Sequence, residues 1–438
     1  MTQPYIFHLP AYVKNLKEKT RTDKNSDRVL AVSTSWDRSR SIKMAVRAVP
    51  VSEKHLLDNV PENDGAKFCL PTSAQGGGEN GNVDGRRGVK MWREKEKRFV
   101  VMGHRGNGMN MLELSDRRMK AIRENTIRSF LNAGKVGLDF VEFDVQVTKD
   151  GFPVIFHDVF LFTEEKGLIT EKRVTDLSLD EFLSYGPQRS AENVGKPIYR
   201  KTKGGTIFEW AVEDDDHLCI LKDVFQSVND SLGFNIELKF DNNRVYTEAE
   251  LVRVIQVIMQ VVLDDAKERV IMFSTFHPDA ALLIRKLQNL YPVFFLSNGG
   301  NELHSDSRRN SLEEAVKLCL AGGLQGIVSE VKAILRNPGA ITKIKDSHLS
   351  LITYGQLNNV GEVVYMQRNM GVEGVIVDVV EEIMETVSEL DDRDGGERGQ
   401  ALCIDEKTVL MEKMDRHCSK EEILCLFSLL PQLLHQWC

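Results

Sequence analysis

Short runs of apolar residues recur through the middle of the chain and alternate with longer stretches in which apolar residues have helical spacing. Each run has five or six residues rich in Val, Ile, Phe and Leu, which is typical of buried strands. The runs lie at 98–102, 140–145, 234–239, 270–274, 293–297, 326–330, 349–354 and 374–378. Strands separated by helices predict a parallel sheet with right-handed crossovers, and eight such strands predict closure into an α/β fold, a (β/α)8 barrel.

Helix boundaries are signalled between these runs. The spacing of a capping box, a serine or threonine three positions before a glutamate, occurs at Ser178, Thr247 and Ser311. Gly323 follows a helical pattern and predicts a helix end. The most apolar stretch, 251–263, keeps helical spacing and is interrupted by polar residues, so it predicts a core-facing helix.

One apolar run does not fit the alternation of strands and helices. PVIF at 153–156 follows the second strand after only TKDGF, which is too short for a parallel crossover. The pair Asp150-Gly151 is a hairpin signal. We therefore predict a β-hairpin over 145–156, which would carry His157 and Asp158 back over the rim of the barrel.

Glycine-rich polar stretches at 75–88 and 389–400 mark the limits of this core. They predict an N-terminal extension over 1–95 that is mostly disordered, a barrel over 96–390, and a linker with an amphipathic helix over 391–438. That helix is indicated by a capping box and an apolar face that ends before Pro431. The preferred interpretation is that the face docks on the barrel, and the alternatives are self-association and contact with a membrane surface.

Composition narrows the class of protein. The net charge of −8 over 438 residues gives no indication of nucleic-acid binding, which would need a basic face. The absence of a run of ~18 apolar residues predicts no stable membrane insertion. Seven scattered cysteines without a C-x-x-C pair favour a reducing compartment. We expect a cytoplasmic protein; the alternative, a plastid protein, rests on the basic, serine-containing first ~45 residues, for which an upstream extension is the preferred interpretation.

Carboxylates stand on the predicted inner face of two strands. Glu142 and Asp144 are two positions apart, so both lie on one face while their apolar neighbours face the other way. Glu237 and Lys239 repeat this pattern. Like charges at a barrel end repel unless a cation or a proton joins them. A single pair of this kind is more typical of a structural ion pair. Three carboxylates together, without zinc-type spacing, predict one divalent hard cation, Mg²⁺ or Ca²⁺.

Two histidines directly follow predicted strands. A lone histidine at such a place is usually structural, but His104 and His157 are both aimed at the same rim, which predicts a general acid–base pair. Arg105 and Lys239 would add positive charge near the metal, which suits a phosphodiester substrate. Asp158 is interpreted as orienting His157 or capping the next segment.

Four segments carry a resemblance to a known family. GHRG at 103–106, RENT at 123–126, FVEFDVQVTKDGFPVIFHD at 140–158 and NIELK at 235–239 together resemble the glycerophosphodiester phosphodiesterases over roughly 97–390. The segments GHRGNGMNML and TYGQLNNV are similar to those of the plant soluble branch in particular. Residues 44–55 resemble the start of these plant relatives, which implies that residues 1–43 are an added segment. The resemblance implies a barrel of the phospholipase C type, one divalent metal, and hydrolysis of glycerophosphodiesters to glycerol 3-phosphate and an alcohol.

The resemblance also implies a role for each matching position. The site it implies consists of metal ligands Glu142, Asp144 and Glu237, an acid–base pair His104 and His157, and phosphate contacts Arg105 and Lys239. For Glu124, the resemblance implies a hydrogen bond to Arg105 or to the glycerol. The alternative is a structural role as a carboxylate at a helix N-terminus. Tyr354 stands where many relatives have a tryptophan and would shape the pocket for the leaving alcohol.

The mechanism that the family implies has two steps. One histidine deprotonates the glycerol 2-hydroxyl, which attacks phosphorus within the same molecule, and the other protonates the leaving oxygen. Water then opens the cyclic phosphate with the roles reversed. The preferred assignment makes His104 the base and His157 the acid. Two alternative functions stay open, a lysophospholipase D acting on lysophospholipids and a non-catalytic barrel that binds phosphodiesters.

Overall fold

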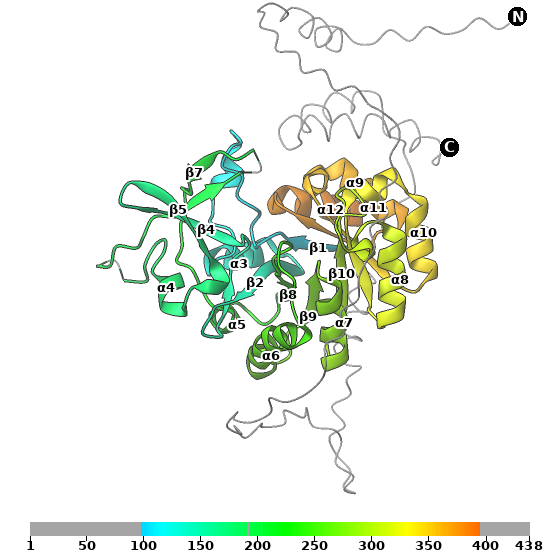
Figure 1. Cartoon of the computed structure of the whole chain (residues 1–438). Coiled ribbons are helices and arrows are strands. Elements are labelled where there is room, and N and C mark those ends of the chain that lie inside the picture. The colour runs from blue at the N-terminus through cyan, green and yellow to red at the C-terminus, as the bar shows by residue number, and fades with distance from the viewer. Residues whose placement is uncertain (1–97, 191, 203, 395–438) are drawn as a thin grey trace, which may run out of the picture. The chain divides into compact units, whose positions relative to one another are not determined.

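The larger sheet of this chain closes on itself. The computed structural model describes residues 98–190, 192–202 and 204–394. Its eight parallel strands run in the order β1-β13-β12-β11-β10-β9-β8-β2, and β1 pairs again with β2. They are β1 (Val100–Gly103), β2 (Phe140–Val147), β8 (Gly233–Leu238), β9 (Ile271–Thr275), β10 (Val293–Ser297), β11 (Gly326–Glu330), β12 (Ser350–Tyr354) and β13 (Gly374–Val377). The predicted (β/α)8 barrel is confirmed, and each strand coincides with a predicted run to within two residues (Figure 1).

Helices cover the outside of the barrel and pack on the outward residues of the strands. They are α3 (Ile127–Val136), α5 (Leu221–Ser227), α6 (Glu248–Asp265), α7 (Pro278–Leu287), α8 (Leu312–Gly322), α9 (Val331–Arg336), α10 (Gly339–Asp346), α11 (Gly361–Met370) and α12 (Val380–Asp394), with short 3₁₀ turns η1 (Arg117–Lys120), η3 (Ser307–Arg309) and η4 (Gln356–Asn359). Thr247 forms the predicted reciprocal capping box with Glu250, and Ser311 caps α8 by accepting from the backbone N–H of Glu314. Gly323 ends α8 at a φ of 63°.

Side-chain alternation along the strands decides what fills the barrel. The inward positions of its lower part are apolar, and they form one separate cluster: Val100, Met102, Phe140, Met272, Phe294, Leu296, Val328, Ile352 and Ile376. The same alternation continues toward the carboxyl ends of the strands, where the inward positions become polar: Glu142, Asp144, Glu237, Tyr354 and Asp378. The apolar layer therefore closes the lower barrel, and the charged side chains gather at one end of it.

The predicted hairpin is present. Strand β3 (Pro153–Ile155) runs antiparallel to β2, with Val145 opposite Ile155 and Val147 opposite Pro153. Gly151 takes a φ of 91° in the connection, a backbone conformation that glycine adopts without strain. The chain then leaves the barrel through His157.

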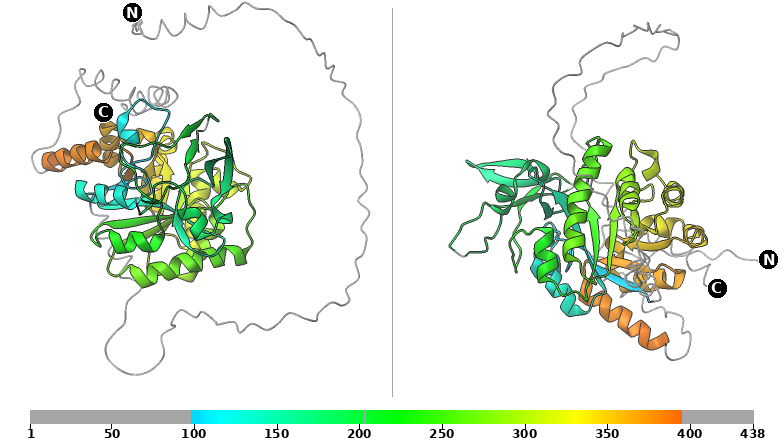
Figure 2. Two further views of the ribbon diagram at one scale, coloured as in Figure 1. Left: turned by 90° about the vertical axis from the view of Figure 1, so that its left-hand side faces the viewer. Right: turned by 90° about the horizontal axis from the view of Figure 1, so that it is seen from below.

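A second sheet, which the sequence did not predict, is inserted between β3 and α5. Its order is β5-β4-β6-β7, and all pairings are antiparallel. It comprises β4 (Phe160–Glu165), β5 (Leu168–Arg173), β6 (Tyr199–Lys201) and β7 (Ile207–Glu209), with η2 (Val174–Asp176) and α4 (Leu179–Leu183) between β5 and β6. Ser178 forms the predicted capping box at the start of α4. This inserted sheet stands beside the barrel and has an apolar cluster of its own (Figures 1 and 2).

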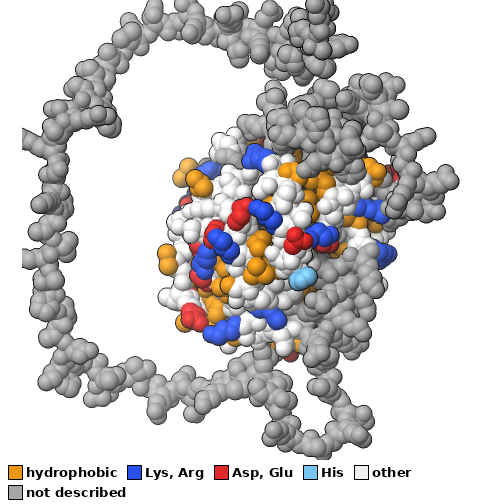
Figure 3. Space-filling model, turned by 90° about the vertical axis from the view of Figure 1, so that its right-hand side faces the viewer, with side chains coloured by type: hydrophobic (Ala, Val, Ile, Leu, Met, Phe, Trp, Pro, Cys, Tyr) orange, Lys and Arg blue, Asp and Glu red, His pale blue; other side chains and the backbone are white. Residues whose placement is uncertain are grey.

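Two predicted parts lie outside the described residues, which begin at 98 and end at 394: the N-terminal extension 1–95 and the amphipathic helix near the C-terminus. Helix α12 continues to Asp394, which is inside the charged stretch 389–400. Within the described residues, no helix is both long and apolar enough to cross a membrane. On the face drawn in Figure 3, acidic and basic side chains are interspersed with scattered apolar ones.

Candidate active site

The turn after β1 is held in a strained backbone conformation. Arg105 has a φ of 51° and Gly106 a φ of 96°. A Cβ atom on Gly103 would lie 1.9 Å from the carbonyl oxygen of Gly106, so only glycine fits there. The backbone N–H of Arg105 donates to Oε2 of Glu142 at 2.9 Å. The GHRG turn is thus fixed directly to a carboxylate of the second strand, and left-handed residues of this kind are concentrated at functional sites.

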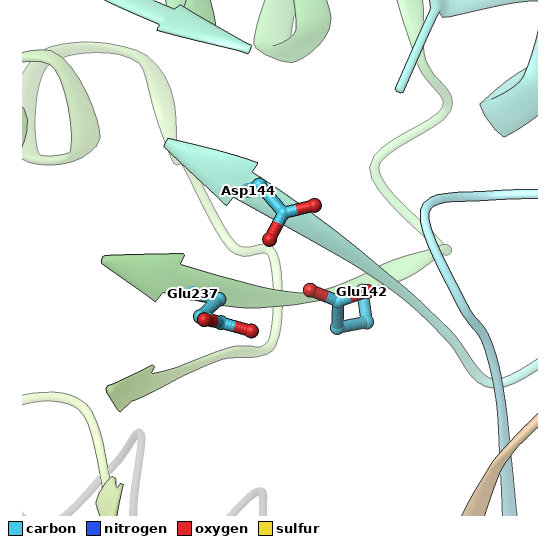
Figure 4. A group of neighbouring side chains, drawn as sticks. All are labelled: Glu142, Asp144 and Glu237. Carbon is cyan, nitrogen blue, oxygen red and sulfur yellow. The ribbon is translucent and has the colours of Figure 1, made fainter. Parts of the chain in front are cut away.

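The three predicted carboxylates come together. Glu142 and Asp144 lie on β2 and Glu237 on the neighbouring β8, where Asp144 and Glu237 are direct partners in register (Figure 4). One oxygen from each lies within 4.8 Å of the others, and all three side chains are buried. Nζ of Lys239 lies 2.7 Å from Oε1 of Glu237 and 3.4 Å from Oδ1 of Asp144, so one lysine faces two of the acids.

Burial of these acids shifts their proton affinities apart. Burial and the charge of Asp144 raise the pKa of Glu142 to about 8, and burial also raises the pKa of Glu237. Burial disfavours the charge of Asp144 too, but His157, Lys239 and other positive groups outweigh it and hold its pKa below the usual range. Three buried oxygen donors that repel one another are the donor set that a hard divalent cation fits.

His104 is held by a carboxylate from the last strand. Its Nδ1 lies 2.7 Å from Oδ1 of Asp378, and its Nε2 lies 4.0 Å from Oε2 of Glu142. Asp378 also accepts hydrogen bonds from Nδ2 of Asn359 and from the backbone N–H of Met109, both at 2.9 Å. Burial lowers the pKa of His104, but the charge of Asp378, the hydrogen bond to it and the charge of Glu142 together outweigh this effect, so the pKa lies above its usual value.

His157 is held by the residue that follows it. Its Nδ1 lies 2.7 Å from Oδ1 of Asp158. Nε2 of Gln146 donates to the carbonyl oxygens of Phe156 and Asp158, at 2.8 and 2.9 Å, and so fixes the backbone on both sides of the histidine. Burial and the positive charges of Arg105 and Lys239 lower the pKa of His157 to about 4. The two histidines therefore stand in unlike electrostatic surroundings.

Arg105 and Glu124 form a buried pair behind the acids. Nη1 of Arg105 lies 2.6 Å from Oε1 of Glu124, and its Nε lies 3.4 Å from Oδ2 of Asp144. That Nε is buried and has no hydrogen-bond acceptor among the described residues. Glu124 also accepts from Arg200 and from the backbone N–H of Asn110. Of the roles considered for Glu124, the structure shows the contact with Arg105; Thr126, and not Glu124, caps the following helix.

Tyr354 ends β12 and faces an aromatic neighbour. Its ring packs edge-on against Phe276 with 6.0 Å between the centroids. Nζ of Lys239, which contacts Glu237, lies 6.0 Å from the centroid of the Phe276 ring. Direct contacts thus join the predicted site residues from β1, β2 and β8. His157 is linked to Asp144 by charge and bonded to Asp158, and Tyr354 is linked to Lys239 through Phe276.

Several residues at the site were missed in the sequence. Asn125 donates from Nδ2 to Oδ2 of Asp144 at 2.8 Å and takes a φ of 56°. Asp378 was seen only as the end of a strand, although its inward position at the same barrel end was a usable signal. Arg200 lies on the inserted sheet that was not predicted, so no signal placed it near the site.

Comparison with known proteins decides the family. The model of the glycerophosphoryl diester phosphodiesterase family matches residues 104–382. The chain belongs to this family. The resemblance found in the sequence is confirmed, and with it the assignment as an enzyme that hydrolyses glycerophosphodiesters.

Individual relatives agree with the family. Glycerophosphodiester phosphodiesterase GDPD3 of Arabidopsis thaliana is 57% identical over 342 residues, which are 77% of this chain and 91% of that protein. Glycerophosphodiester phosphodiesterase GDPD1, chloroplastic, of the same plant is 54% identical over 348 residues, 79% of this chain and 90% of that one. A crystal structure from Silicibacter pomeroyi assigned to glycerophosphoryl diester phosphodiesterases has a TM-score of 0.50 and 18% identity, covering 67% of this chain and 94% of that one, and shows the shared fold.

Proposed function

We propose that this enzyme cleaves glycerophosphodiesters such as glycerophosphocholine and glycerophosphoethanolamine to sn-glycerol 3-phosphate and the free alcohol, through a cyclic phosphate. The observation that carries the proposal is the constellation itself. Three buried carboxylates lie within 4.8 Å of one another, and two histidines beside them are each oriented by a carboxylate at 2.7 Å. A protein that only bound phosphodiesters would have no use for two oriented proton-transfer groups.

Glu142, Asp144 and Glu237 would hold one divalent cation, Mg²⁺ or Ca²⁺. Both ions prefer oxygen ligands, and these three side chains offer carboxylate oxygens in a buried setting. When bound, the ion supplies positive charge near the phosphate. The ammonium of Lys239 now faces Glu237. If Glu237 held the cation, this ammonium would be available to the phosphate of the substrate.

Arg105 and Lys239 are proposed to contact the phosphate. Nε of Arg105 is buried and lacks an acceptor among the described residues, as expected for a donor reserved for a ligand. The other side of its guanidinium is fixed by Glu124, whose carboxylate is occupied by protein donors. We therefore place Glu124 behind Arg105 as a support and not in contact with the glycerol.

The proton-transfer roles that we propose reverse the assignment preferred from the sequence. A pKa near 4 leaves His157 neutral at pH 7, which suits the group that takes the proton from the 2-hydroxyl. The raised pKa of His104 favours the protonated form, which suits the group that gives a proton to the leaving oxygen. His157 is thus the base of the first step and His104 the acid, and the roles exchange when water opens the cyclic phosphate.

A change of leaving group tests this assignment. An aryl alcohol such as 4-nitrophenol leaves without a proton, so a variant that lacks the acid should recover activity on a glycerophosphoryl aryl ester. We expect His104→Ala to recover activity on the aryl ester relative to the choline ester, and His157→Ala to stay inactive on both. Recovery in His157→Ala alone would restore the assignment preferred from the sequence.

Tyr354 and Phe276 are proposed to form one wall of the pocket for the leaving alcohol. Their rings meet at 6.0 Å at the carboxyl end of the barrel, and Lys239 lies against Phe276. If so, Tyr354→Ala changes the ratio of kcat/KM between glycerophosphocholine and glycerophosphoethanolamine. An unchanged ratio would remove Tyr354 from the pocket.

The main test is the release of glycerol 3-phosphate from glycerophosphocholine by the purified full chain, with Mg²⁺, with Ca²⁺ and with a chelator. We expect release that stops with the chelator and returns with one of the ions. No release under any condition would favour the phosphodiester-binding barrel. Release of lysophosphatidic acid from lysophosphatidylcholine, without release from glycerophosphocholine, would favour a lysophospholipase D.

We also propose a cytoplasmic location, with the plastid as the alternative. The support for the cytoplasm is the cysteine pattern of the sequence, and the support for the plastid is the relative named chloroplastic. Expression in plant cells of fluorescent fusions of the full chain and of a form beginning at Met44 would distinguish the two. Plastid import of the full chain alone would overturn the cytoplasmic proposal.

A further inference from the structure

The inserted sheet reaches the active site through one arginine. Arg200 lies in the middle of β6 and its side chain is 11% exposed. Its Nη1 and Nη2 donate to the two oxygens of Glu124 at 2.8 and 2.9 Å, a two-pronged contact that fixes the orientation of both groups. Glu124 is the partner of Arg105, so Arg200 contacts the support of the proposed phosphate-binding group.

The same guanidinium also reaches the support of His157. Its Nη2 lies 3.3 Å from Oδ1 of Asp158, and its Nε lies 3.2 Å from Oδ2. Oδ1 is the oxygen that faces Nδ1 of His157 at 2.7 Å. Arg200 is therefore shared between two carboxylates that face two different groups of the active site. Burial raises the pKa of Asp158, but the charge of Arg200, together with the bond to His157 and smaller charge effects, holds that pKa below its usual range.

The inserted sheet holds this guanidinium in place. The indole of Trp210, directly after β7, stacks against it at 4.3 Å from the ring centroid. Nε1 of Trp210 donates to Oδ1 of Asn110 at 3.0 Å, and the backbone N–H of Asn110 donates to Glu124 at 2.5 Å. Phe156, the residue before His157, packs against Trp210 with 6.0 Å between ring centroids. The inserted sheet thus touches both sides of the His157 segment.

From these contacts we propose that Arg200 is a positioning residue. It bridges Glu124, which holds Arg105, and Asp158, which holds His157, and through this bridge the inserted sheet orients both Arg105 and His157. The inference rests on the proposed function, because it assigns these two groups to phosphate binding and proton transfer. Since Arg200 acts through Glu124 and Asp158, its loss changes the geometry of the reacting groups without removing a contact with the substrate. A misplacement of reacting groups by about 1 Å can lower the rate about 100-fold.

Arg200→Lys is the decisive variant. A lysine keeps the buried positive charge, so the chain should still fold, but a single ammonium cannot span the two carboxylates as the planar guanidinium does. We expect kcat for glycerophosphocholine to fall about 10- to 100-fold with KM unchanged. Arg200→Gln should lose more kcat and also unfold at a lower temperature, because Glu124 keeps its buried charge with one partner fewer.

The matched control is Lys201→Gln. Lys201 follows Arg200 on the same strand, and its side chain is exposed, so the variant removes one positive charge from the same sheet without touching Glu124 or Asp158. We expect wild-type kcat and KM. A loss in this control equal to that in Arg200→Lys would show a general effect of charge and would overturn the proposal.

A measurement without turnover separates positioning from general stability. In chelated protein with ¹⁵N-labelled histidine, the Nδ1 proton of His157 in its bond to Asp158 should give a low-field resonance, identified by its absence from His157→Gln. We expect this resonance to shift in Arg200→Lys and to stay in place in Lys201→Gln.

The outcomes are distinguishable from a failure of the proposed function. An inactive wild-type enzyme would remove the proposed function, while the resonance would still report on Arg200. Wild-type kcat in a folded Arg200→Lys, or an unshifted His157 resonance, would overturn the positioning role and leave the proposed function standing.

Discussion

Nδ1 of His104 lies 2.7 Å from Oδ1 of Asp378, although the two residues are 274 positions apart in the chain. The contact joins the turn after the first barrel strand to the end of the last one, where β1 and β13 pair in parallel. A carboxylate at this place orients the imidazole and stabilises its charged form. The closure of the barrel therefore also orients one of the two histidines for which we propose proton transfer.

Asp378→Asn should lower kcat about 10²- to 10⁴-fold while KM for glycerophosphocholine changes little, because an amide neither fixes the same tautomer of His104 nor stabilises its charge. Steady-state kinetics at saturating metal measures both constants. Asp346→Asn is the matched control, since Asp346 ends α10 on the surface. Equal activity of Asp378→Asn and wild type would show that His104 needs no carboxylate.

The crowding of Glu142, Asp144 and Glu237 predicts how metal changes stability. Glu142→Gln replaces a buried carboxyl, whose pKa is raised to about 8, by an amide that stays neutral, and it keeps an oxygen to accept from the backbone N–H of Arg105. With the metal removed by a chelator, we expect the unfolding temperature of the variant to be equal to or higher than that of the wild type. Added Mg²⁺ or Ca²⁺ at about 100 times its Kd should stabilise the wild type by about 2.7 kcal/mol and the variant far less.

Thermal unfolding followed by fluorescence, with and without the ion, tests this prediction independently of activity. Glu248→Gln on the exposed first turn of α6 is the control and should respond to metal as the wild type does. An equal metal-induced shift in Glu142→Gln and wild type would place the cation elsewhere.

The barrel and the cluster of three carboxylates were predictable because they follow from alternation along strands. Apolar runs of five or six residues marked all eight strands, and the two-residue spacing of Glu142 and Asp144 placed both carboxylates inside. The register that makes Asp144 the neighbour of Glu237 comes from the structure, because parallel pairing alone does not determine which residues of two strands lie side by side. The short TKDGF connection likewise sufficed for the hairpin that carries His157.

The inserted sheet was not predictable in the same way because its strands bury little. Strand β5 has no fully buried residue, and β6 and β7 have three residues each, so neither length nor alternation distinguishes them from loops. Arg200 consequently had no expected place. Its partners Glu124 and Asp158 lie 76 and 42 positions away, a pairing that only the tertiary structure brings about.

The lowered pKa of His157 predicts a pH dependence of stability. Its pKa of about 4 lies below the usual 6.5, so the unfolded chain binds the proton more tightly. Its contribution is therefore fully present above pH 6.5 and is lost as the pH falls toward 4. Between these values, the wild type should lose roughly 1–3 kcal/mol more unfolding free energy than His157→Gln.

Urea unfolding of both proteins at pH 7 and pH 4.5 gives this difference. His348→Gln, which removes an exposed histidine just after α10, should follow the wild type. If His157→Gln and wild type lost stability in parallel, His157 would not be held in its neutral form.

The last prediction concerns two glycines that differ in their surroundings. At Gly103, a Cβ would meet the carbonyl oxygen of Gly106 at 1.9 Å and a methyl of Leu138 at 2.9 Å, so Gly103→Ala must displace the turn that holds His104. We expect a loss of about 3 kcal/mol in unfolding free energy, together with a fall in kcat, because the shifted turn also loses the bond from Arg105 to Glu142.

Gly134 lies inside α3, and the nearest neighbour of its added Cβ is 3.5 Å away. Gly134→Ala should stabilise the chain by about 0.4–1 kcal/mol without a change in kcat. Urea unfolding and steady-state kinetics on both variants measure this contrast, and wild-type kinetics in Gly103→Ala would show that the turn does not set the position of His104.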